Sequence, residues 1–342
     1  MNITTLGIDL AKNIFQLHGA DNRGKAVLKR TLTRNKLPEF IANLPTCRIV
    51  MEACSGANYW ARKFKEYGHE VKLISPQFVK PFVKGNKNDR NDSEAIVEAA
   101  SRPTMRYVSP KTVEQQDMQG LLRLREGCIE MRTKISNQMR GLLAEYGIVV
   151  PQGESHLRKA LPKFFDRNKD NELTIAFKEM IEMQYSLLLK INEQIDQFEK
   201  KIKMISKTNE ACQRVQAVEG IGPITAVALL ATIGDPNDFK NGRHFAAFLG
   251  LVPRQSSSGG KERLLGISKH GDNYLRQLLI HGARSAVLYA GKKVNARNQW
   301  INGLKIRRGT NRTCVAVANK NARIVLALLK NKETYKPAGQ QA

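Results

Sequence analysis

The sequence predicts an α/β domain built on a mixed sheet, then a long helical segment, then a mostly helical domain. Short apolar runs separated by turn residues fill the first quarter of the chain, two long helical patterns follow, and basic residues concentrate in the last quarter. We expect these domains to span residues 1–150, 151–207 and 208–332, followed by a tail at 333–342.

Five apolar runs predict strands: residues 3–8, 15–18, 26–32, 48–51 and 71–74. Residues 35–43 and 55–67 have helical spacing, and Tyr59, Trp60 and Phe64 share one face of the second helix. The order of three strands, helix, strand, helix, strand predicts a mixed sheet with helices on its faces.

The motif Gly7-Ile8-Asp9 places a carboxylate at the end of the first strand. A carboxylate there is costly without a partner, and a metal ion is a common one. A strand-terminal acid on a three-strand meander indicates an RNase H-like nuclease core, or the actin and sugar-kinase ATPases. Those ATPases are expected to carry a second Asp-x-Gly phosphate loop and a Gly-rich adenosine loop, and neither occurs in this sequence.

The middle of the chain alternates between loops and helices. A polar, basic loop is expected at 84–91, helices at 92–100 and 111–146, and irregular structure at 147–171, which contains two prolines.

Residues 172–206 carry the clearest heptad pattern, which predicts a coiled-coil helix. The expected seam comprises Phe177, Ile181, Gln184, Leu188, Ile191, Ile195, Phe198, Ile202 and Ile205. This pattern favours self-association, and the alternative is an antiparallel helix pair within one chain.

The last domain begins with an apolar segment that is interrupted by Gly220-Ile221-Gly222-Pro223. Two glycines around an aliphatic residue before a helix resemble a helix-hairpin-helix turn, whose amides hold a phosphate. The alternative is a tight turn between helices that binds no ligand. Helices are also expected at 272–290 and 313–329, on either side of a basic region.

The charge of the chain predicts a polyanionic partner. The sequence has 56 Lys and Arg residues against 31 Asp and Glu, a formal net charge of +25, and residues 254–336 contain 18 of the former and three of the latter. Neutralising phosphates with such residues releases counterions, so a nucleic acid is a better first candidate than a small metabolite. A solvated basic surface is the alternative.

The five cysteines are scattered and include no Cys-x-x-Cys pair, so neither a disulfide framework nor a zinc site is expected. The first residues lack the features of a signal peptide, and no apolar run approaches 18 residues. We expect a cytoplasmic protein without a membrane partner, associated with the nucleoid when it acts.

Four carboxylates form the first candidate site: Asp9, Glu52, Asp89 and Asp92. Asp9 and Glu52 end predicted strands, and neighbouring strands would point them into one crevice. Asp89 and Asp92 lie three residues apart at a helix start. Such oxygen ligands suit Mg²⁺ and phosphoryl transfer. The alternative for the Asp pair is ordinary helix capping.

The second candidate is the Ser/Gly loop Ser256-Ser257-Ser258-Gly259-Gly260. A serine in this loop is a possible nucleophile toward a phosphodiester, activated by cations or a metal. The alternative is a flexible loop. Basic residues around the loop and further along the chain are predicted phosphate contacts, with a solvated surface as the alternative: Arg254, Lys261, Arg263, Lys269, Arg307 and Arg308.

The order of the motifs resembles that of the insertion-sequence 110 family of transposases, relatives of the Piv DNA invertase, from residue 5 to about 330. The resemblance rests on five segments: Gly7-Ile8-Asp9-Leu10-Ala11-Lys12, Met51-Glu52-Ala53-Cys54-Ser55-Gly56, Asn88-Asp89-Arg90-Asn91-Asp92-Ser93-Glu94-Ala95, Gly220-Ile221-Gly222 and Phe245-Ala246-Ala247-Phe248-Leu249-Gly250-Leu251-Val252-Pro253-Arg254.

The resemblance implies a RuvC-like domain whose DEDD tetrad falls on Asp9, Glu52, Asp89 and Asp92, a central coiled coil, and a C-terminal transposase domain with a nucleophilic serine. Alignment on residues 250–254 and the following glycine places that serine at Ser258, although Ser256 and Ser257 are adjacent. It also implies a structured noncoding (bridge) RNA that pairs with donor and target DNA.

These observations lead to the hypothesis of a bacterial DNA recombinase that moves its own element. In this hypothesis, Asp9, Glu52, Asp89 and Asp92 bind Mg²⁺, and Ser258 forms a covalent phosphoserine link to DNA. A homodimer or homotetramer is expected, because two DNA sites must meet. The alternatives are a RuvC-like junction nuclease without a covalent step and a non-enzymatic nucleic-acid-binding protein.

Overall fold

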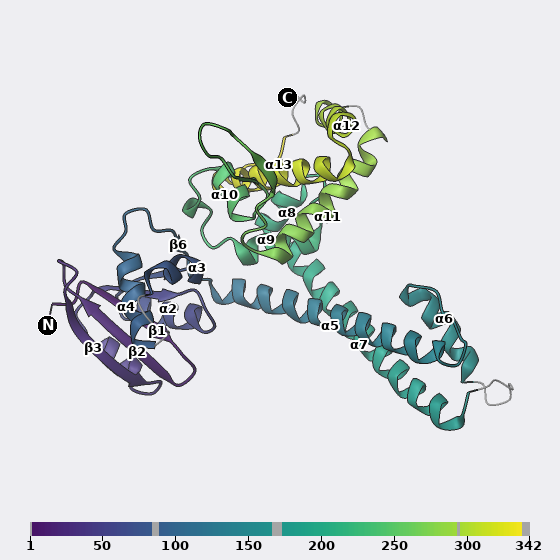
Figure 1. Ribbon diagram of the computed structural model, residues 1–342, viewed down its shortest axis with the longest axis horizontal. Coiled ribbons are helices and arrows are strands. Elements are labelled where there is room, and N and C mark those ends of the chain that lie inside the picture. The colour runs from purple at the N-terminus through teal and green to yellow at the C-terminus, as the bar shows by residue number, and fades with distance from the viewer. Residues whose placement is uncertain (1, 84–88, 166–172, 293–294, 337–342) are drawn as a thin grey trace. The chain divides into compact units, whose positions relative to one another are not determined.

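The computed structural model describes residues 2–83, 89–165, 173–292 and 295–336, and only the backbone of Asp89 and Arg90 (Figure 1). The chain forms two compact units. Unit 1 consists of Met1–Gln116 and Ala231–Lys240, and unit 2 of Asp117–Leu230 and Asn241–Ala342. Each unit therefore contains two separate stretches of the chain.

Unit 1 contains a six-stranded mixed sheet with strand order β3-β2-β1-β4-β5-β6. The strands are β1 (Thr5–Leu10), β2 (Ile14–Ala20), β3 (Ala26–Thr33), β4 (Arg48–Glu52), β5 (Glu70–Ile74) and β6 (Tyr107–Val108). The first three strands pair antiparallel as the predicted meander, β1, β4 and β5 run parallel, and β6 is antiparallel to β5. The mixed sheet is confirmed, and β6 is an addition that its two residues did not signal.

Helices cover both faces of the sheet. The helices of unit 1 are α1 (Leu37–Ala42), α2 (Ala57–Glu66), the short α3 (Pro76–Val79) with η1 (Lys80–Phe82), and α4 (Asp89–Ala100). Ile8 of β1 and Met51 of β4 share a core with Trp60 of α2. Val50, one residue before Met51, belongs instead to a second core with Ile96 of α4. Alternate residues of each central strand therefore face α2 and α4.

Helix α4 lies directly on strand β1 at Gly7. A Cβ at Gly7 would lie 2.6 Å from both the Ser93 carbonyl oxygen and Val97 Cγ2. Only a residue without a side chain allows this approach of helix to strand. The helix begins three residues earlier than expected, at Asp89 instead of Asp92, and residues 84–88 of the predicted loop lie outside the described residues.

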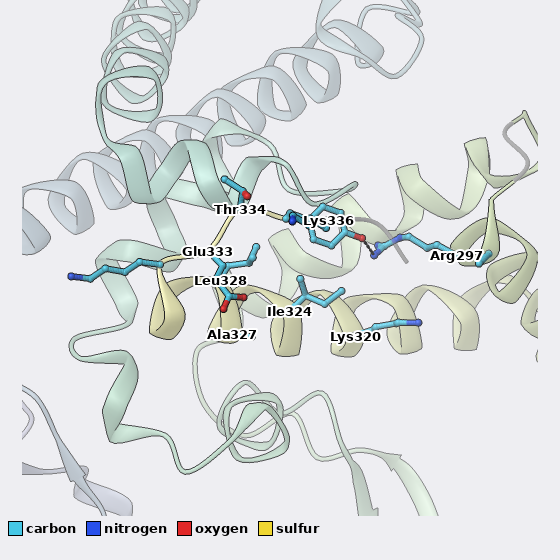
Figure 2. A pocket seen from close by; sticks show the side chains of 11 residues that line it. Arg297, Lys320, Ile324, Ala327, Leu328, Glu333, Thr334 and Lys336 are labelled. Carbon is cyan, nitrogen blue, oxygen red and sulfur yellow. Dashed lines mark hydrogen bonds between the residues drawn. The ribbon is translucent and has the colours of Figure 1, made fainter. Parts of the chain in front are cut away.

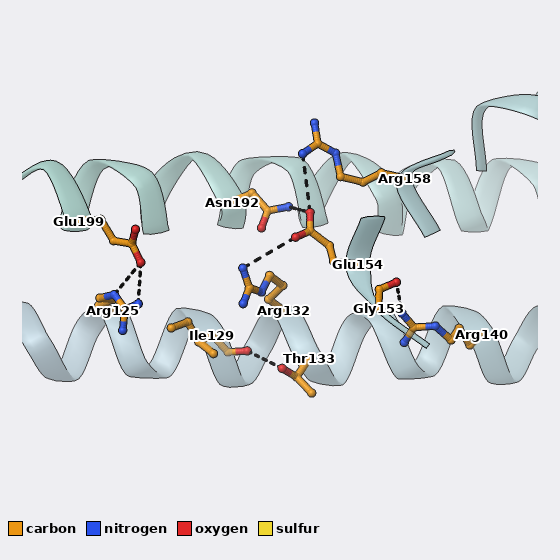
Figure 3. A network of polar contacts seen from close by, with 10 residues as sticks. All are labelled: Arg125, Ile129, Arg132, Thr133, Arg140, Gly153, Glu154, Arg158, Asn192 and Glu199. Atoms are coloured by element: carbon orange, nitrogen blue, oxygen red, sulfur yellow. Dashed lines mark hydrogen bonds and ion pairs between the residues drawn. The ribbon is translucent and has the colours of Figure 1, made fainter. Parts of the chain in front are cut away.

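Unit 2 begins with a helical hairpin of α5 (Val113–Ala144, whose first residues belong to unit 1), α6 (Glu154–Phe164) and α7 (Ile175–Thr208). Arg125 of α5 donates to Glu199 of α7, whereas further along α5 Arg132 lies 3.8 Å from Glu154, which accepts from Asn192 of α7 (Figure 3). The two long helices are therefore antiparallel.

The heptad seam of α7 is covered within the chain. Phe177, Ile181 and Leu188 share a core with α5 and α6, and Ile191 and Ile195 pack with Cys128 of α5. These five residues fit the alternative interpretation, an antiparallel helix pair within one chain, and self-association stays a prediction.

The expectation of irregular structure at 147–171 is wrong for residues 154–164, which form α6. Two prolines suggested a break, but Pro162 falls near the end of the helix, and Leu157 and Leu161, four residues apart, are fully buried. Residues 166–171 of this stretch lie outside the described residues.

The rest of unit 2 is mostly helical. It contains α8 (Glu210–Gln216), α9 (Pro223–Thr232, which ends in unit 1), α10 (Gly242–Phe248), α11 (Asn273–Tyr289), α12 (Ala296–Arg308) and α13 (Thr310–Asn331), with short 3-10 turns η2 (Pro236–Asp238, in unit 1) and η3 (Ala290–Lys292). Two short strands, β7 (Pro253–Gln255) and β8 (Leu264–Ile267), form a separate hairpin. Helix α12 was not expected in the basic region. Of the helices in the described ranges, none combines the length and hydrophobicity of a membrane span.

We predict that Gly7→Ala destabilises unit 1 by about 1–3 kcal/mol, because the new methyl group forces α4 away from β1. Thermal unfolding followed by circular dichroism measures this change. Gly120→Ala is the control, because a Cβ at this helical position meets no atom within 4 Å and alanine favours helix. Equal stability of Gly7→Ala and the parent would contradict the close packing.

Candidate active site

Three of the four predicted carboxylates gather on one face of the unit 1 sheet. Strands β1 and β4 pair in parallel with Ile8 opposite Met51, and Asp9 and Glu52 are the next residues of the two strands. By the alternation of the strands, both lie on the face that α4 covers. Asp92 lies in the first turns of α4, directly before Ser93, which contacts Gly7.

The acids interact through their charges. Burial raises the pKa of Glu52, and the negative charges of Asp9 and Asp92 raise it further. The same environment acts on Cys54, whose pKa is raised by burial and then by Glu52 and Asp9. Like charges raise an acid's pKa at short range, so Asp9 and Asp92 lie near Glu52. Cys54 is a neighbour that the sequence analysis did not single out, although it lies two residues beyond Glu52.

The fourth acid, Asp89, begins α4 one turn before Asp92, and its side chain lies outside the described residues. Among the side chains that the structure describes, no group of three or more His, Cys, Asp or Glu is arranged to hold a metal ion. The donor set nevertheless consists of carboxylate oxygens that repel one another, and hard divalent cations bind such a set. The residues therefore fit a divalent metal by their chemistry.

Glu94, two residues beyond Asp92, joins α4 to the sheet. Its Oε2 lies 3.2 Å from Lys29 Nζ of β3 and 3.8 Å from Nδ1 of the buried His18 of β2. Burial lowers the pKa of His18. The negative charge of Glu94 raises that pKa, but by less. These contacts hold the first turns of α4 beside the strand ends.

In unit 2, the predicted serine loop is the tip of the β7–β8 hairpin. Ser256 N donates to Arg263 O at 2.9 Å, and Ser258 forms a β-bridge with Lys261 across the turn. Gly259 and Gly260 have φ angles of +56° and +75°, which glycine adopts without strain. The serine loop therefore lies at the end of a short hydrogen-bonded hairpin.

The serines of this turn differ in their hydrogen bonds. Ser257 Oγ accepts from Gln255 Nε2 at 3.0 Å and from Arg263 N at 3.4 Å. The Ser258 hydroxyl makes no hydrogen bond with any described residue, and its side chain is exposed. Ser257 thus supports the hairpin, whereas Ser258 presents its hydroxyl to the solvent.

The base of the hairpin is held by close backbone contacts. Gly250 and Gly271 have positive φ angles, and a Cβ on either would overlap a carbonyl oxygen, of His270 or Phe248. The buried Arg276 guanidinium donates to His270 O at 3.0 Å and to Leu249 O at 3.3 Å. The hairpin therefore rises from a rigid base.

The Gly220-Ile221-Gly222 turn joins α8 to α9. Gly220, with φ +90°, packs so closely on Gly282 of α11 that neither accepts a side chain. This contact accounts for a glycine at position 220 without a ligand. It fits the alternative interpretation, a tight turn between helices. Gly222 is exposed and directly precedes the first residue of α9, and a Cβ at this position would meet no atom within 4 Å.

The predicted phosphate-contacting residues are exposed. They lie on the hairpin and its base or at the end of α12: Arg254, Lys261, Arg263, Lys269, Arg307 and Arg308. Their exposure is compatible with a phosphate contact and with a solvated basic surface.

An acidic site at the ends of strands, in a chain of charge +25, defines a class of enzymes that act on nucleic-acid phosphates. Comparison with known families narrows this class. The family described as "Transposase IS116/IS110/IS902 family" matches residues 212–299, and a DEDD transposase family of the IS110 type matches residues 6–148.

Individual relatives support the same family. The transposase for insertion sequence element IS1111A of Coxiella burnetii is 48% identical over 98% of this chain and 92% of its own, and a probable family 20 transposase of Pseudomonas aeruginosa is 46% identical over 98% and 100%. A pilin gene-inverting protein of Moraxella bovis is 23% identical over 82% of both chains. The chain belongs to the IS110 family of transposases, enzymes that cut and rejoin DNA.

We predict that Glu52→Gln raises the melting temperature of unit 1 in EDTA at neutral pH. The pKa of Glu52 is raised in the folded state, so folded protein binds more protons and loses stability as the pH rises through that raised pKa. Replacing the charged Glu52 with glutamine removes this loss of stability. Each kcal/mol regained raises the melting temperature by about 2–4 °C. Thermal scans at several pH values measure it, with the exposed Glu66→Gln as control.

The same scans with Mg²⁺ test the metal site. Mg²⁺ is expected to raise the melting temperature of the parent more than that of Glu52→Gln, because binding to the folded state stabilises it. An equal response of both proteins would exclude Glu52 as a ligand.

Proposed function

We propose that this transposase cuts and rejoins DNA through a serine nucleophile, Ser258, assisted by Mg²⁺ at the carboxylate site. The observation that carries the proposal is the exposed Ser258 hydroxyl at the tip of a hydrogen-bonded hairpin. Its neighbour Ser257 is already occupied by two hydrogen bonds, which favours Ser258 over Ser257. Ser256 is exposed as well, and the alignment implied by the family resemblance favours Ser258 over it.

The covalent step is a transesterification. The Ser258 Oγ attacks the scissile phosphate, the Oγ–P bond forms, and the bond from phosphorus to the leaving strand breaks. The leaving strand takes up the proton as a hydroxyl group. After strand exchange, the hydroxyl of the incoming strand attacks the phosphoserine and releases Ser258.

The carboxylates Asp9, Glu52, Asp89 and Asp92 would hold the metal. When bound, Mg²⁺ supplies Lewis-acid stabilisation of phosphate charge and lowers the pKa of an oxygen bound to it. The chain contributes the framework: β1 and β4 pair in parallel and carry Asp9 and Glu52, and α4 carries Asp92. In this proposal, the carboxylate site is one half of the active site and Ser258 the other.

We also propose that the substrates are donor and target DNA and that a homodimer or homotetramer brings them together. The pilin gene-inverting relative supports a reaction between two DNA sites. Arg254, Lys261, Arg263 and Lys269 would contact phosphates beside Ser258, while Arg307, Arg308, Gly220 and Gly222 would contact them elsewhere on unit 2. The reaction would take place in the cytoplasm, at the nucleoid.

Ser258→Ala is expected to reduce recombination by about three orders of magnitude or more, because the nucleophile is lost. Denaturing gels of stalled complexes should show a protein–DNA adduct in the parent that is absent in Ser258→Ala. Ser256→Ala should retain the adduct, and Ser257→Ala should weaken it only by loosening the hairpin.

An adduct that disappears only with Ser256→Ala or Ser257→Ala would move the nucleophile to that serine. DNA cleavage that survives loss of all three serines would replace the proposal with a RuvC-like nuclease that hydrolyses without a covalent step.

A guide RNA is the second part of the proposal, supported by the excess of basic residues. Protein purified from cells that carry the whole element is expected to retain one discrete structured RNA. Sequencing the bound RNA measures this, with protein expressed without the flanking element DNA as the control. Random fragments in both preparations would contradict a guide.

A further inference from the structure

Two cavities of about 810 Å³ each adjoin on the surface of α13. Both are lined by Lys320, Ile324 and Ala327 of this helix. The first lies between α13 and the tail that follows it, where Tyr335 accepts from Arg297 (Figure 2). The second extends to the start of β7 and the end of β8. We call the two cavities together the α13 groove.

The α13 groove ends at the serine hairpin. Pro253, the first residue of β7, and Ile267, the last residue of β8, line its second cavity. Asn319 of α13 donates to Leu251 O at 3.2 Å, and a Cβ at Gly242 of α10 would lie 3.0 Å from Arg323 Cβ. The groove wall is thus packed against the base from which the hairpin rises.

The lining is strongly basic. One acidic residue, Glu333, contributes to it, and the cationic residues are Arg297, Arg312, Lys320, Arg323, Lys332 and Lys336. Arg297 is buried and bound to Asn321 at 2.6 Å, so the other five carry the accessible positive charge. Such a surface attracts a polyanion.

The groove also contains an accessible indole. Trp300 of α12 is half-buried, and Lys320 Nζ lies over its ring, 4.2 Å from the centroid, in a cation–π contact. Burial lowers the pKa of Lys320, and the charges of Arg297 and Arg323 lower it further. These cations repel one another, and an anion between them would relieve that repulsion. A ring beside mutually repelling cations is the arrangement that binds a base and its phosphate.

We propose that the α13 groove binds an unpaired DNA strand, in which a base displaces Lys320 from the face of Trp300 and phosphates bind Lys320, Arg323 and Arg312. This inference rests on the proposed function, because the groove leads to the hairpin of Ser258. Duplex DNA keeps its base faces stacked, so Trp300 reaches only an unpaired strand. The groove would hold the strand adjoining the cut while its partner is exchanged.

The intrinsic fluorescence of tryptophan tests the proposal without catalysis. The chain has two tryptophans, and the other, Trp60, is buried in unit 1, so the Trp60→Phe protein reports on Trp300 alone. A short oligothymidylate is expected to quench this emission by stacking. Lys320→Ala and Arg323→Ala should each weaken binding about tenfold and lower the salt slope by about 0.7.

Lys201→Ala removes one exposed charge from α7 and is the matched control, with unchanged affinity expected. Trp300→Leu should also weaken binding. Because this variant lacks the reporter indole, its binding is measured by the fluorescence anisotropy of a labelled strand. Absence of quenching, equal quenching by a matched duplex, or binding of oligouridylate alone would overturn the proposal. Because Ser258→Ala should bind normally, failure of the groove and failure of the serine mechanism are separate results.

Discussion

The contact of helix α4 with strand β1 at Gly7 is the constraint on which the acidic site depends. The backbone of Ser93 lies where a side chain of residue 7 would be, so the helix reaches the sheet itself. Asp92 is adjacent to Ser93, and Asp9 lies two residues beyond Gly7 on the same face. Gly7 of the Gly-Ile-Asp motif thus allows α4 to bring Asp92 close to Asp9.

The arrangement has an electrostatic cost. Burial and the charges of Asp9 and Asp92 raise the pKa of Glu52, which costs stability at neutral pH, and the contacts of Glu94 with Lys29 and His18 link α4 to the sheet. A protein under no functional demand would gain stability by losing one of these charges. The sheet, helix α4 and the contacts of Glu94 therefore form a site that a bound cation would stabilise.

The sequence predicted what depends on periodicity and order. Apolar runs located the central strands. Asp9 and Glu52 were expected to share a crevice if their strands were neighbours, and β1 and β4 are neighbours. Prediction from the sequence failed where local signals were weak or ambiguous. Helix α6 contains Pro162, and the strands of the serine hairpin are only three and four residues long, with exposed leucines in β8. The heptads of α7 revealed an apolar seam, but periodicity does not say whether α5 or a second chain covers it. The α13 groove joins residues far apart in the sequence, which no local pattern links.

The central claim is that Asp9, Glu52 and Asp92 form one charge-coupled site. The most direct measurement is a carbon-13 NMR titration of the Glu52 carboxyl group in metal-free protein, assigned with Glu52→Gln. The expected pKa of Glu52 lies above the usual value for glutamate and falls in both Asp9→Asn and Asp92→Asn. A Glu52 pKa at its ordinary value, or one that neither substitution changes, would contradict it.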